Sequence, residues 1–346
     1  MKVLIAFNQP AEETPENELD RISETAVENQ VDAVMRSVRD LGYEPICLGV
    51  KNLEIDLEMI EQFRPDVVFN LCEGYRGSAR HEMHVASIWE LLGLPYTGNT
   101  PLTLGLAQDK VLSKQLFRAL SVPTPDFQVF TEVKQKFELD FPVIAKPSRE
   151  DASLGITATS VVNDEIGLRR AVADLLKRYR QPVLVESFID GREFNVSLLG
   201  NQPARVVAVA EIQFTDLPAD QPRITSYEAK WLPDHPAYRQ TPSICPAKID
   251  AALRSRLDET ALQVYSALHG RDYGRVDMRV DHSGKVFVLE YNPNPDISAD
   301  AGFARALHAA GIKYSQFVST IIEQAIARKN NDSNPKNAAS RSFSNL

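Results

Sequence analysis

Short apolar runs alternate with amphipathic stretches over the first 100 residues, and this alternation constrains the fold more than any other feature of the chain. Three runs are typical of buried strands: residues 2–7, 44–50 and 65–74. Two stretches have the apolar spacing of helices and end at glycines: residues 31–42 and 81–93. Strands and helices in alternation predict a parallel sheet with helices on both faces. We therefore expect an N-terminal doubly wound α/β domain, with a ligand site where the strand at 65–74 ends.

The rest of the chain predicts two further lobes of mixed α+β type. One helix is expected over residues 101–120, followed by a Val-Pro-Thr-Pro run that can serve as a hinge. Strand and helix signals then continue to residue 329, interrupted by a long loop at 213–247 that is rich in Pro, Asp and Thr. We expect domains at 1–100, 101–190 and 191–329, and a polar, disordered tail at 330–346.

The bulk composition excludes several classes of function. A formal net charge of −9 argues against a general nucleic-acid binder, although it leaves room for a local basic pocket that holds a nucleotide. No run approaches the ~20 apolar residues of a membrane span, and the N-terminal apolar run is too short for a signal peptide. Cys47, Cys72 and Cys245 are too widely spaced for a disulfide framework or a zinc knuckle, which indicates a reducing, cytoplasmic setting.

Residues 274–292 predict two strands joined at a Ser-Gly turn. If the turn is a two-residue loop, Asp277 lies opposite Glu290 and Arg275 lies opposite Asn292, all on one face. Opposed carboxylates repel each other, but a hard divalent ion such as Mg²⁺, with Mn²⁺ as an alternative, prefers such oxygen ligands. The pattern predicts a metal site at Asp277, Glu290 and Asn292, with Arg275 beside it to meet a phosphate or an oxyanion. The alternative is an exposed sheet face on which arginines neutralise the acids.

These strands, with their RVD and LEYN sequences, resemble the magnesium-binding strands of ATP-grasp ligases, and especially those of the D-alanine–D-alanine ligase family. Four further segments follow that family's order and resemble its domain junction, its phosphate-lysine strand with a glycine-bearing loop, its adenine hinge and its active-site loop: residues 91–125, 141–157, 183–200 and 227–231. The resemblance covers roughly residues 1–328. It implies a three-lobed ATP-grasp fold, ATP and Mg²⁺ as cofactors, small-molecule substrates and a homodimer.

The resemblance also implies roles for the matching residues. ATP would be bound by Lys110, Lys146, Ser153, Gly155, Glu186, Ser187, Phe188, Ile189, Glu193 and Lys230. Lysines would contact the phosphates, Glu186 and the hinge backbone would meet the adenine edge, and Glu193 would accept from the ribose hydroxyls. Lys230 and Arg275 would act in catalysis, with Arg275 steadying the tetrahedral intermediate, and the metal would lie at the hairpin.

The positions that bind D-alanine in this family differ in this chain. The affected positions are Glu73 and Gly74 where the family has His-Gly, Ala152 where it has a serine, Trp231 where it has a tyrosine, and Asp296 and Ala301 where it has a glycine and a serine. The family's N-terminal glutamate has no certain match; Ser23 and Glu24 fall nearby. A carboxylate at Asp296 should repel a substrate carboxylate and favour a cationic or hydroxyl-bearing group.

Several of these residues could instead have purely structural roles. Asp296 could cap a helix that begins near residue 299, and Glu73 could pair with a nearby arginine. His81 and His84, three residues apart, could bind a metal, but buried or surface histidines without a metal are more common.

The implied activity is ATP-dependent ligation of a carboxylate to an amine through an acyl phosphate. The altered substrate positions favour joining an amino acid to another amino acid or to a specialised small acceptor, as in natural-product or mycosporine-like amino acid biosynthesis. The alternatives are a D-alanine–D-alanine ligase of cell-wall synthesis and a non-catalytic nucleotide-binding protein.

Overall fold

The computed structural model describes residues 1–9, 18–151, 153–201, 203–218, 221–232 and 234–332. These residues form two compact units: unit 1 contains Met1–Pro101 and the segment from Asp296 onward, and unit 2 contains Leu102–Pro295. The tail expected from residue 330 is wrong at its start, because a helix continues to Asp332, and from residue 333 on it lies outside the described residues. The expected division into three domains stays a prediction.

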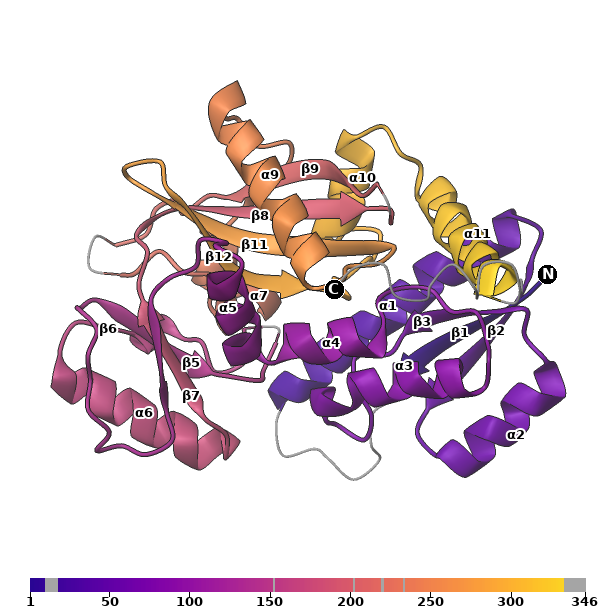
Figure 1. Ribbon diagram of the computed structural model, residues 1–346, viewed down its shortest axis with the longest axis horizontal. Coiled ribbons are helices and arrows are strands. Elements are labelled where there is room, and N and C mark those ends of the chain that lie inside the picture. Colours follow the sequence, from indigo (N-terminus) through magenta and orange to yellow (C-terminus); the bar gives the residue numbers. More distant parts are fainter. Residues whose placement is uncertain (10–17, 152, 202, 219–220, 233, 333–346) are drawn as a thin grey trace. The chain divides into compact units, whose positions relative to one another are not determined.

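Unit 1 is built on a three-stranded parallel sheet in the order β2-β1-β3, which confirms the predicted sheet type (Figure 1). The strands are β1 (Lys2–Asn8), β2 (Glu44–Val50) and β3 (Val67–Leu71). Val3, Ile5 and Val67 are fully buried, as expected for a sheet that is covered on both faces.

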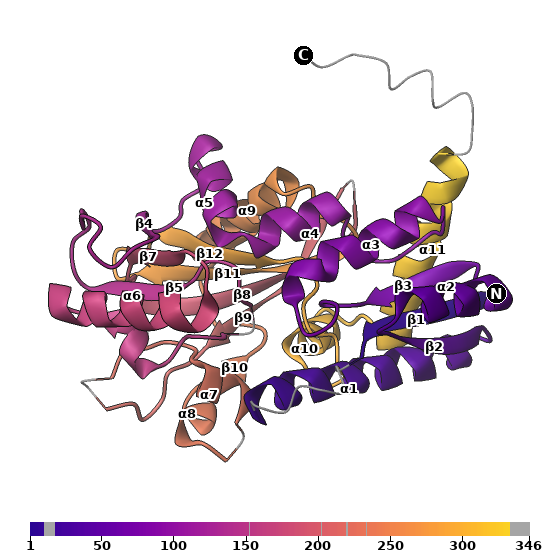
Figure 2. The ribbon, with the colours of Figure 1, turned by 90° about the horizontal axis from the view of Figure 1, so that it is seen from below.

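Helices and a short 3₁₀ turn complete the described part of unit 1. They are α1 (Glu18–Asp40), α2 (Leu53–Phe63), η1 (Ala79–His81), α3 (Glu82–Leu91), α10 (Gly302–Ala309) and α11 (Tyr314–Asp332). Helix α11 packs beside α1 and against β3, so a segment from the end of the chain completes the N-terminal sheet's cover (Figure 2). That association joins residues far apart in the sequence.

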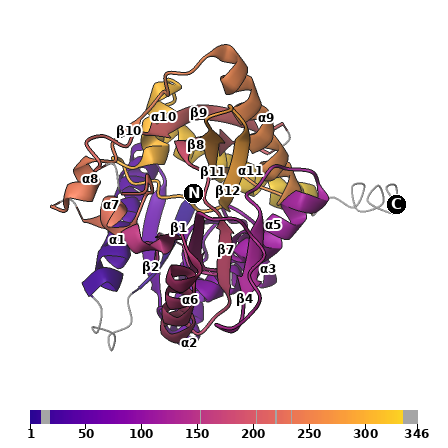
Figure 3. The same cartoon turned by 90° about the vertical axis from the view of Figure 1, so that its left-hand side faces the viewer.

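Unit 2 contains two antiparallel sheets. The smaller has the order β4-β7-β5-β6, from β4 (Phe127–Phe130), β5 (Val143–Pro147), β6 (Val161–Val162) and β7 (Val183–Ser187). Helix α6 (Glu165–Tyr179) follows the 3₁₀ turn η2 (Ala158–Ser160) and β6, and lies against this sheet (Figure 3). Its buried residues Leu168 and Val172 share a core with Phe130 and Val183.

The larger sheet has the order β10-β9-β8-β11-β12. Its strands are β8 (Gly191–Leu199), β9 (Arg205–Ile212), β10 (Ser243–Ile244), β11 (Tyr273–Asp281) and β12 (Val286–Asn292). Helix α9 (Ala251–Ala267) covers one face, and its Leu257 and Val264 share a core with Val276 and Tyr291 (Figure 1). The side chains that alternate with these on β11 and β12 face away from that core and are mostly polar.

Two expectations for unit 2 are wrong. The single helix expected over residues 101–120 is two helices, α4 (Pro101–Gln108) and α5 (Lys110–Ala119), because the Asp109 carboxylate accepts the first free amides of α5, from Val111 and Leu112, at 3.1 Å. The expected loop at 213–247 contains helices α7 (Tyr227–Trp231) and α8 (Pro236–Arg239) and strand β10. Across the described residues, no helix combines the length and hydrophobicity needed to span a membrane.

Candidate active site

Asp277 on β11 lies directly opposite Glu290 on β12, and Arg275 lies opposite Asn292. This is the predicted register. The residues between them on each strand, Val276 and Tyr291, are buried in the core below. Strand periodicity then directs the four polar side chains to the other face of the sheet.

The turn that produces this register is not the expected two-residue loop. Asp281 pairs with Lys285, which leaves a three-residue loop that ends at Gly284, with φ of +84°. Pairing is therefore displaced by one residue until a bulge between Met278 and Asp277, where Leu289 is the extra residue, restores it. The predicted pairs are correct because two departures from regular pairing cancel.

Arg275 holds the Asp277 carboxylate from its own strand. Its Nε and one terminal nitrogen donate to the two carboxylate oxygens, both at 2.7 Å. The amides of Asn195 and Asn292 donate to Asp277 at 2.7 and 3.0 Å. Asp277, itself largely buried, is thus fixed by four hydrogen bonds from three residues.

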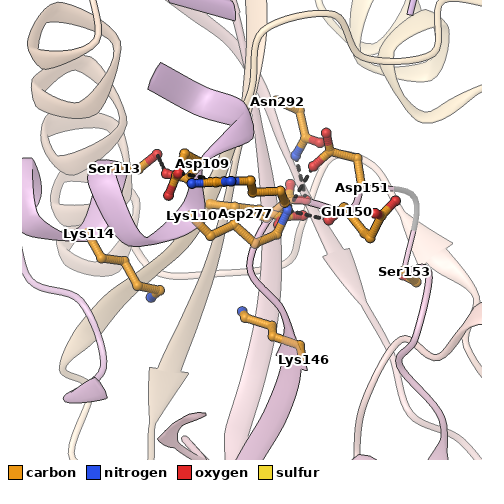
Figure 4. A network of polar contacts seen from close by, with 12 residues as sticks. Asp109, Lys110, Ser113, Lys114, Lys146, Glu150, Asp151, Ser153, Asp277 and Asn292 are labelled. Carbon is orange, nitrogen blue, oxygen red and sulfur yellow. Dashed lines mark hydrogen bonds and ion pairs between the residues drawn. The ribbon is translucent and has the colours of Figure 1, made fainter. Parts of the chain in front are cut away.

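Lys110, at the start of α5, contacts the acidic residues next to Arg275 and Asp277 (Figure 4). Its Nζ donates to the Glu150 carbonyl at 2.6 Å and the Asp151 carboxylate at 2.7 Å, and lies 3.3 Å from the Glu290 carboxylate. Burial opposes the charged form of Lys110, but Asp151 and Glu290 outweigh it and raise the Lys110 pKa. Burial likewise acts to raise the pKa of Glu290, yet Lys110, with smaller effects of Lys146 and Arg275, lowers it to about 2.

A second, deeper cluster contains Glu186 between two lysines. Lys146 Nζ on β5 lies 2.5 Å from Glu186 Oε1, and Lys114 Nζ on α5 lies 2.8 Å from Oε2. Figure 4 shows Lys114 and Lys146 extending toward one another from these two elements. Sequence reasoning missed Lys114, although its position four residues after Lys110 puts both on one helix face.

Glu186 Oε2 is buried and accepts no well-directed hydrogen bond from the described residues, in spite of its closeness to Lys114. Burial alone would raise the Glu186 pKa, but Lys114 and Lys146 outweigh it, and the net shift is downward. Glu186 is therefore an ionised carboxylate with one oxygen still able to accept a donor.

Glu193, the residue expected to bind the ribose, already accepts hydrogen bonds from two side chains of the protein. Arg279 donates to Glu193 Oε2 at 2.7 Å, and Thr225 Oγ1 donates to Oε1 at 2.8 Å. Arg279 is buried, lies 5.2 and 5.5 Å from the centres of the Phe188 and Phe214 rings, and donates to the Ile189 carbonyl at 2.9 Å. Its partners come from separate segments of unit 2, so Arg279 connects the expected adenine hinge, at Ile189, to Glu193.

The hinge backbone makes further bonds. Ser187 N donates to the Asp126 carbonyl at 2.8 Å, and Phe188 N donates to the Pro142 carbonyl at 3.0 Å. With the Ile189 carbonyl bound to Arg279, three backbone groups of Ser187–Ile189 are committed within unit 2. The Glu186 carboxylate is therefore the group of residues 186–189 best able to accept a hydrogen bond from a ligand.

The glycine-bearing loop and the active-site loop meet at residues 225–227. Ser153 Oγ donates to the Thr225 carbonyl at 3.1 Å, and Tyr227 N donates to the Ile156 carbonyl at 3.0 Å. Gly155 packs closely against Pro147, and Ala152 lies outside the described residues. On α7, the Lys230 ammonium lies 5.2 Å from the centre of the Trp231 ring. The two expected loops are therefore neighbours in unit 2.

In unit 1, the buried Gln30 of α1 joins two of the altered substrate positions. Its Nε2 donates to Glu73 Oε1 at 3.0 Å, and its Oε1 accepts from Ile297 N at 3.3 Å. Glu73 N donates to Asn8 Oδ1 at 3.0 Å. A side chain at Gly74 would meet the Ser78 carbonyl at 2.8 Å, so only glycine fits this turn. Gln30 was not predicted, since a buried glutamine on a helix carries no sequence signal.

Asp296 does not cap the helix that follows it. Its Oδ1 accepts from Ser298 N at 2.8 Å and Ser298 Oγ at 2.6 Å, whereas α10 begins at Gly302 with Ala301 at its N-cap. Burial, with Asp296 as a second cause, raises the Tyr314 pKa, and the buried Tyr314 hydroxyl has no hydrogen-bond partner among the described residues. Asp296 therefore holds a local turn near a buried phenol.

The two histidines considered for a metal lie close to each other at the start of α3. His81 Nδ1 and His84 Nδ1 lie 3.3 Å apart. Within the described part of the chain, no group of three or more His, Cys, Asp or Glu residues is arranged to hold a metal ion. The hairpin site accordingly depends on two carboxylates together with the Asn292 amide.

Comparison with known proteins gives the family. A family model for the C-terminal part of D-ala D-ala ligases matches residues 115–323. The D-alanine–D-alanine ligase of Marinomonas sp. (strain MWYL1) is 31% identical over 303 residues, covering 84% of this chain and 88% of that one. The "Uncharacterized protein y4sG" of Sinorhizobium fredii (strain NBRC 101917 / NGR234) is 39% identical over 307 residues, covering 86% and 87%.

The fold has a solved counterpart. The crystal structure of D-alanine–D-alanine ligase from Bacillus anthracis complexed with ATP matches with a TM-score of 0.74 and 20% identity, covering 96% of this chain and 99% of that one. At this identity the match establishes the three-dimensional fold alone. The expected ATP-grasp fold is confirmed.

Proposed function

The chain belongs to the D-alanine–D-alanine ligase family of ATP-grasp ligases, and from this premise we propose that it joins an amino acid to an amine-bearing acceptor other than D-alanine. ATP would phosphorylate the amino acid carboxylate, and the acceptor amine would displace phosphate from the acyl phosphate. No nucleophile of the protein is needed, so binding, orientation and charge neutralisation carry the catalysis.

The chemistry of unit 2 supports ATP as the phosphoryl donor. The buried Glu186 carboxylate can accept a hydrogen bond from the adenine amino group, and Lys110 and Lys146 supply charges for the phosphates. Glu193, although bonded to Arg279, keeps lone pairs for the ribose hydroxyls. Lys230 would reach the phosphates from α7.

The hairpin residues fit a divalent cation. Glu290, with a pKa of about 2, and Asp277, held by Arg275, each offer carboxylate oxygens, and the Asn292 amide offers a further oxygen. Mg²⁺ bound there would neutralise charge on the ATP phosphates. Arg275, on the same face, would donate to the oxyanion of the tetrahedral intermediate.

The single observation that carries the choice of substrate is the bridge that Gln30 makes between Glu73 and the turn at Asp296–Ser298. It holds two carboxylates on one unit, at positions where the family has groups that bind D-alanine. An acceptor with a cationic or hydroxyl-bearing group suits this surface better than the carboxylate of D-alanine.

A phosphate-release screen over D- and L-amino acids, singly and in pairs with amines, followed by the mass of the product, tests this function. We expect turnover with a mixed pair and little with D-alanine alone. Robust turnover with D-alanine as sole substrate would instead establish the second candidate, a D-alanine–D-alanine ligase, which the named activity of the Marinomonas relative favours.

A further inference from the structure

The buried cluster around Glu186 holds one cation more than its carboxylate needs. Lys114 is fully buried, Lys146 is 5% exposed and Glu186 is 2% exposed. Each ammonium lies against a different oxygen of the same carboxylate, at 2.8 and 2.5 Å. Because an unpaired buried charge is costly, a second lysine at this depth requires an explanation.

Lys114 is held at this place by more than Glu186. Its Nζ donates to Thr124 Oγ1 at 2.7 Å, and that hydroxyl donates to the Val288 carbonyl at 2.8 Å. Val288 N in turn donates to the Pro123 carbonyl at 2.8 Å. The Lys114 ammonium is therefore fixed between α5, the segment after it and β12.

Lys146 has a competing partner under the proposed function. An ammonium that turns toward the phosphates of ATP gives up its contact with Glu186. Without another cation, Glu186 would be a lone buried carboxylate and would take up a proton. A protonated acid donates as well as accepts, so it no longer discriminates the amino group of adenine from the oxo group of another purine.

We propose that Lys114 is a positioning residue that keeps Glu186 ionised and turned toward the purine edge, and so makes the site select a 6-amino purine over a 6-oxo purine. The inference rests on the proposed function for ATP as the nucleotide. It extends that function by assigning the base selectivity to the Lys114–Glu186 pair and not to the carboxylate alone.

The test is equilibrium binding of ATP and of ITP, both with Mg²⁺, to the full chain by calorimetry. We expect Lys114→Met to weaken ATP binding roughly tenfold or more while ITP binding changes little, so that the ATP/ITP preference collapses. Lys136→Met is the matched control, because it makes the same replacement at an exposed lysine that is paired with Glu138 at 2.8 Å, and its preference should equal that of the unmodified chain.

Glu186→Gln separates a positioning role from a structural one. In that background the preference is already low, and adding Lys114→Met should lower it no further. A folded Lys114→Met chain with an unchanged ATP/ITP preference overturns the proposal. If the unmodified chain binds neither nucleotide, the proposed function itself fails.

The unmodified chain decides the matter if Lys114→Met does not fold. The proposal requires this chain to bind ATP roughly tenfold or more tightly than ITP, because an ionised Glu186 accepts a hydrogen bond from a 6-amino group and repels a 6-oxo group. Equal affinity for the two nucleotides overturns the proposal.

Discussion

Asp277 and Glu290 lie directly opposite each other on β11 and β12, and each carboxylate is paired with a different cation, Arg275 and Lys110. Opposed like charges destabilise a strand pair unless something compensates them. Here the compensation comes from the same strand for Asp277 and from helix α5 for Glu290. The arrangement leaves two carboxylates side by side on one face of the hairpin, which is the basis of the first prediction.

Replacing either carboxylate, by Asp277→Asn or Glu290→Gln, should lower Mg²⁺-dependent nucleotide turnover. The lost cation contact is worth about 3 kcal/mol, or roughly 10²-fold in rate. EDTA should abolish turnover of the unmodified chain, and added Mg²⁺ should restore it. Asp258→Asn on α9, which removes a carboxylate paired with Arg254 at 2.8 Å, is the control and should stay active. Undiminished activity in both site variants would show the metal assignment to be wrong.

Acid should destabilise the metal-free protein through Glu290. The folded-state pKa of about 2 is below the ordinary value of 4.5, so ionised Glu290 contributes stability that is fully present above about pH 4.5 and is lost as pH falls toward 2. Lys110, with a raised pKa, stays charged throughout this range. Urea unfolding between about pH 5 and 2 should therefore show a smaller pH dependence for Glu290→Gln than for the unmodified chain. Equal slopes would contradict the prediction.

Removing Arg279 should destabilise unit 2 strongly. Arg279→Met leaves Glu193 as a buried carboxylate without its cation and frees the Ile189 carbonyl. Breaking a buried pair on one side costs roughly 3–5 kcal/mol. Chemical denaturation should show this loss, and the double variant Glu193→Gln/Arg279→Met should recover part of it. If the double variant is as unstable as the sum of the single variants, the pair is not coupled.

Gln30→Leu should weaken acceptor binding without changing ATP binding. It removes the bonds that join Glu73 to the Ile297 amide, each worth on the order of 1 kcal/mol, so the KM for the acceptor should rise roughly tenfold. Steady-state kinetics with each substrate varied in turn measures both constants. Asn29→Leu, at an exposed neighbouring position on α1, is the control. A rise in the KM for ATP alone would contradict the proposed place of Gln30.

Asp296→Asn should improve the use of D-alanine as acceptor. Asparagine keeps the oxygen that accepts from Ser298 but removes the charge that repels a carboxylate. The expected gain in kcat/KM for D-alanine is about tenfold, with a loss for an acceptor that carries a cation. Product mass with competing acceptors measures the change. An unchanged ratio of products would mean that Asp296 serves the turn alone.

The sheet of unit 1 and the hairpin part of the candidate site follow from patterns of residues that are near in the sequence. Alternating apolar runs specify the parallel sheet of unit 1, and a period of two specifies which side chains of β11 and β12 share a face. The break between α4 and α5 was missed, because Asp109 acts as a cap only once its side chain meets the Val111 and Leu112 amides. The two-residue turn was wrong, yet the bulge at Leu289 restored the register.

The sequence by itself determined that β11 and β12 pair as a hairpin, since partners near in the chain meet readily, whereas the register that brings Asp277 opposite Glu290 depends on the three-residue loop and the bulge at Leu289. Only the tertiary structure decided that Gln30 meets Ile297, 267 residues away, and that Glu193 meets Arg279, 86 residues away. The same holds for the second lysine on Glu186. Burial makes these polar contacts necessary, because a buried charge or amide must find a partner, but which partner it finds depends on how distant elements pack.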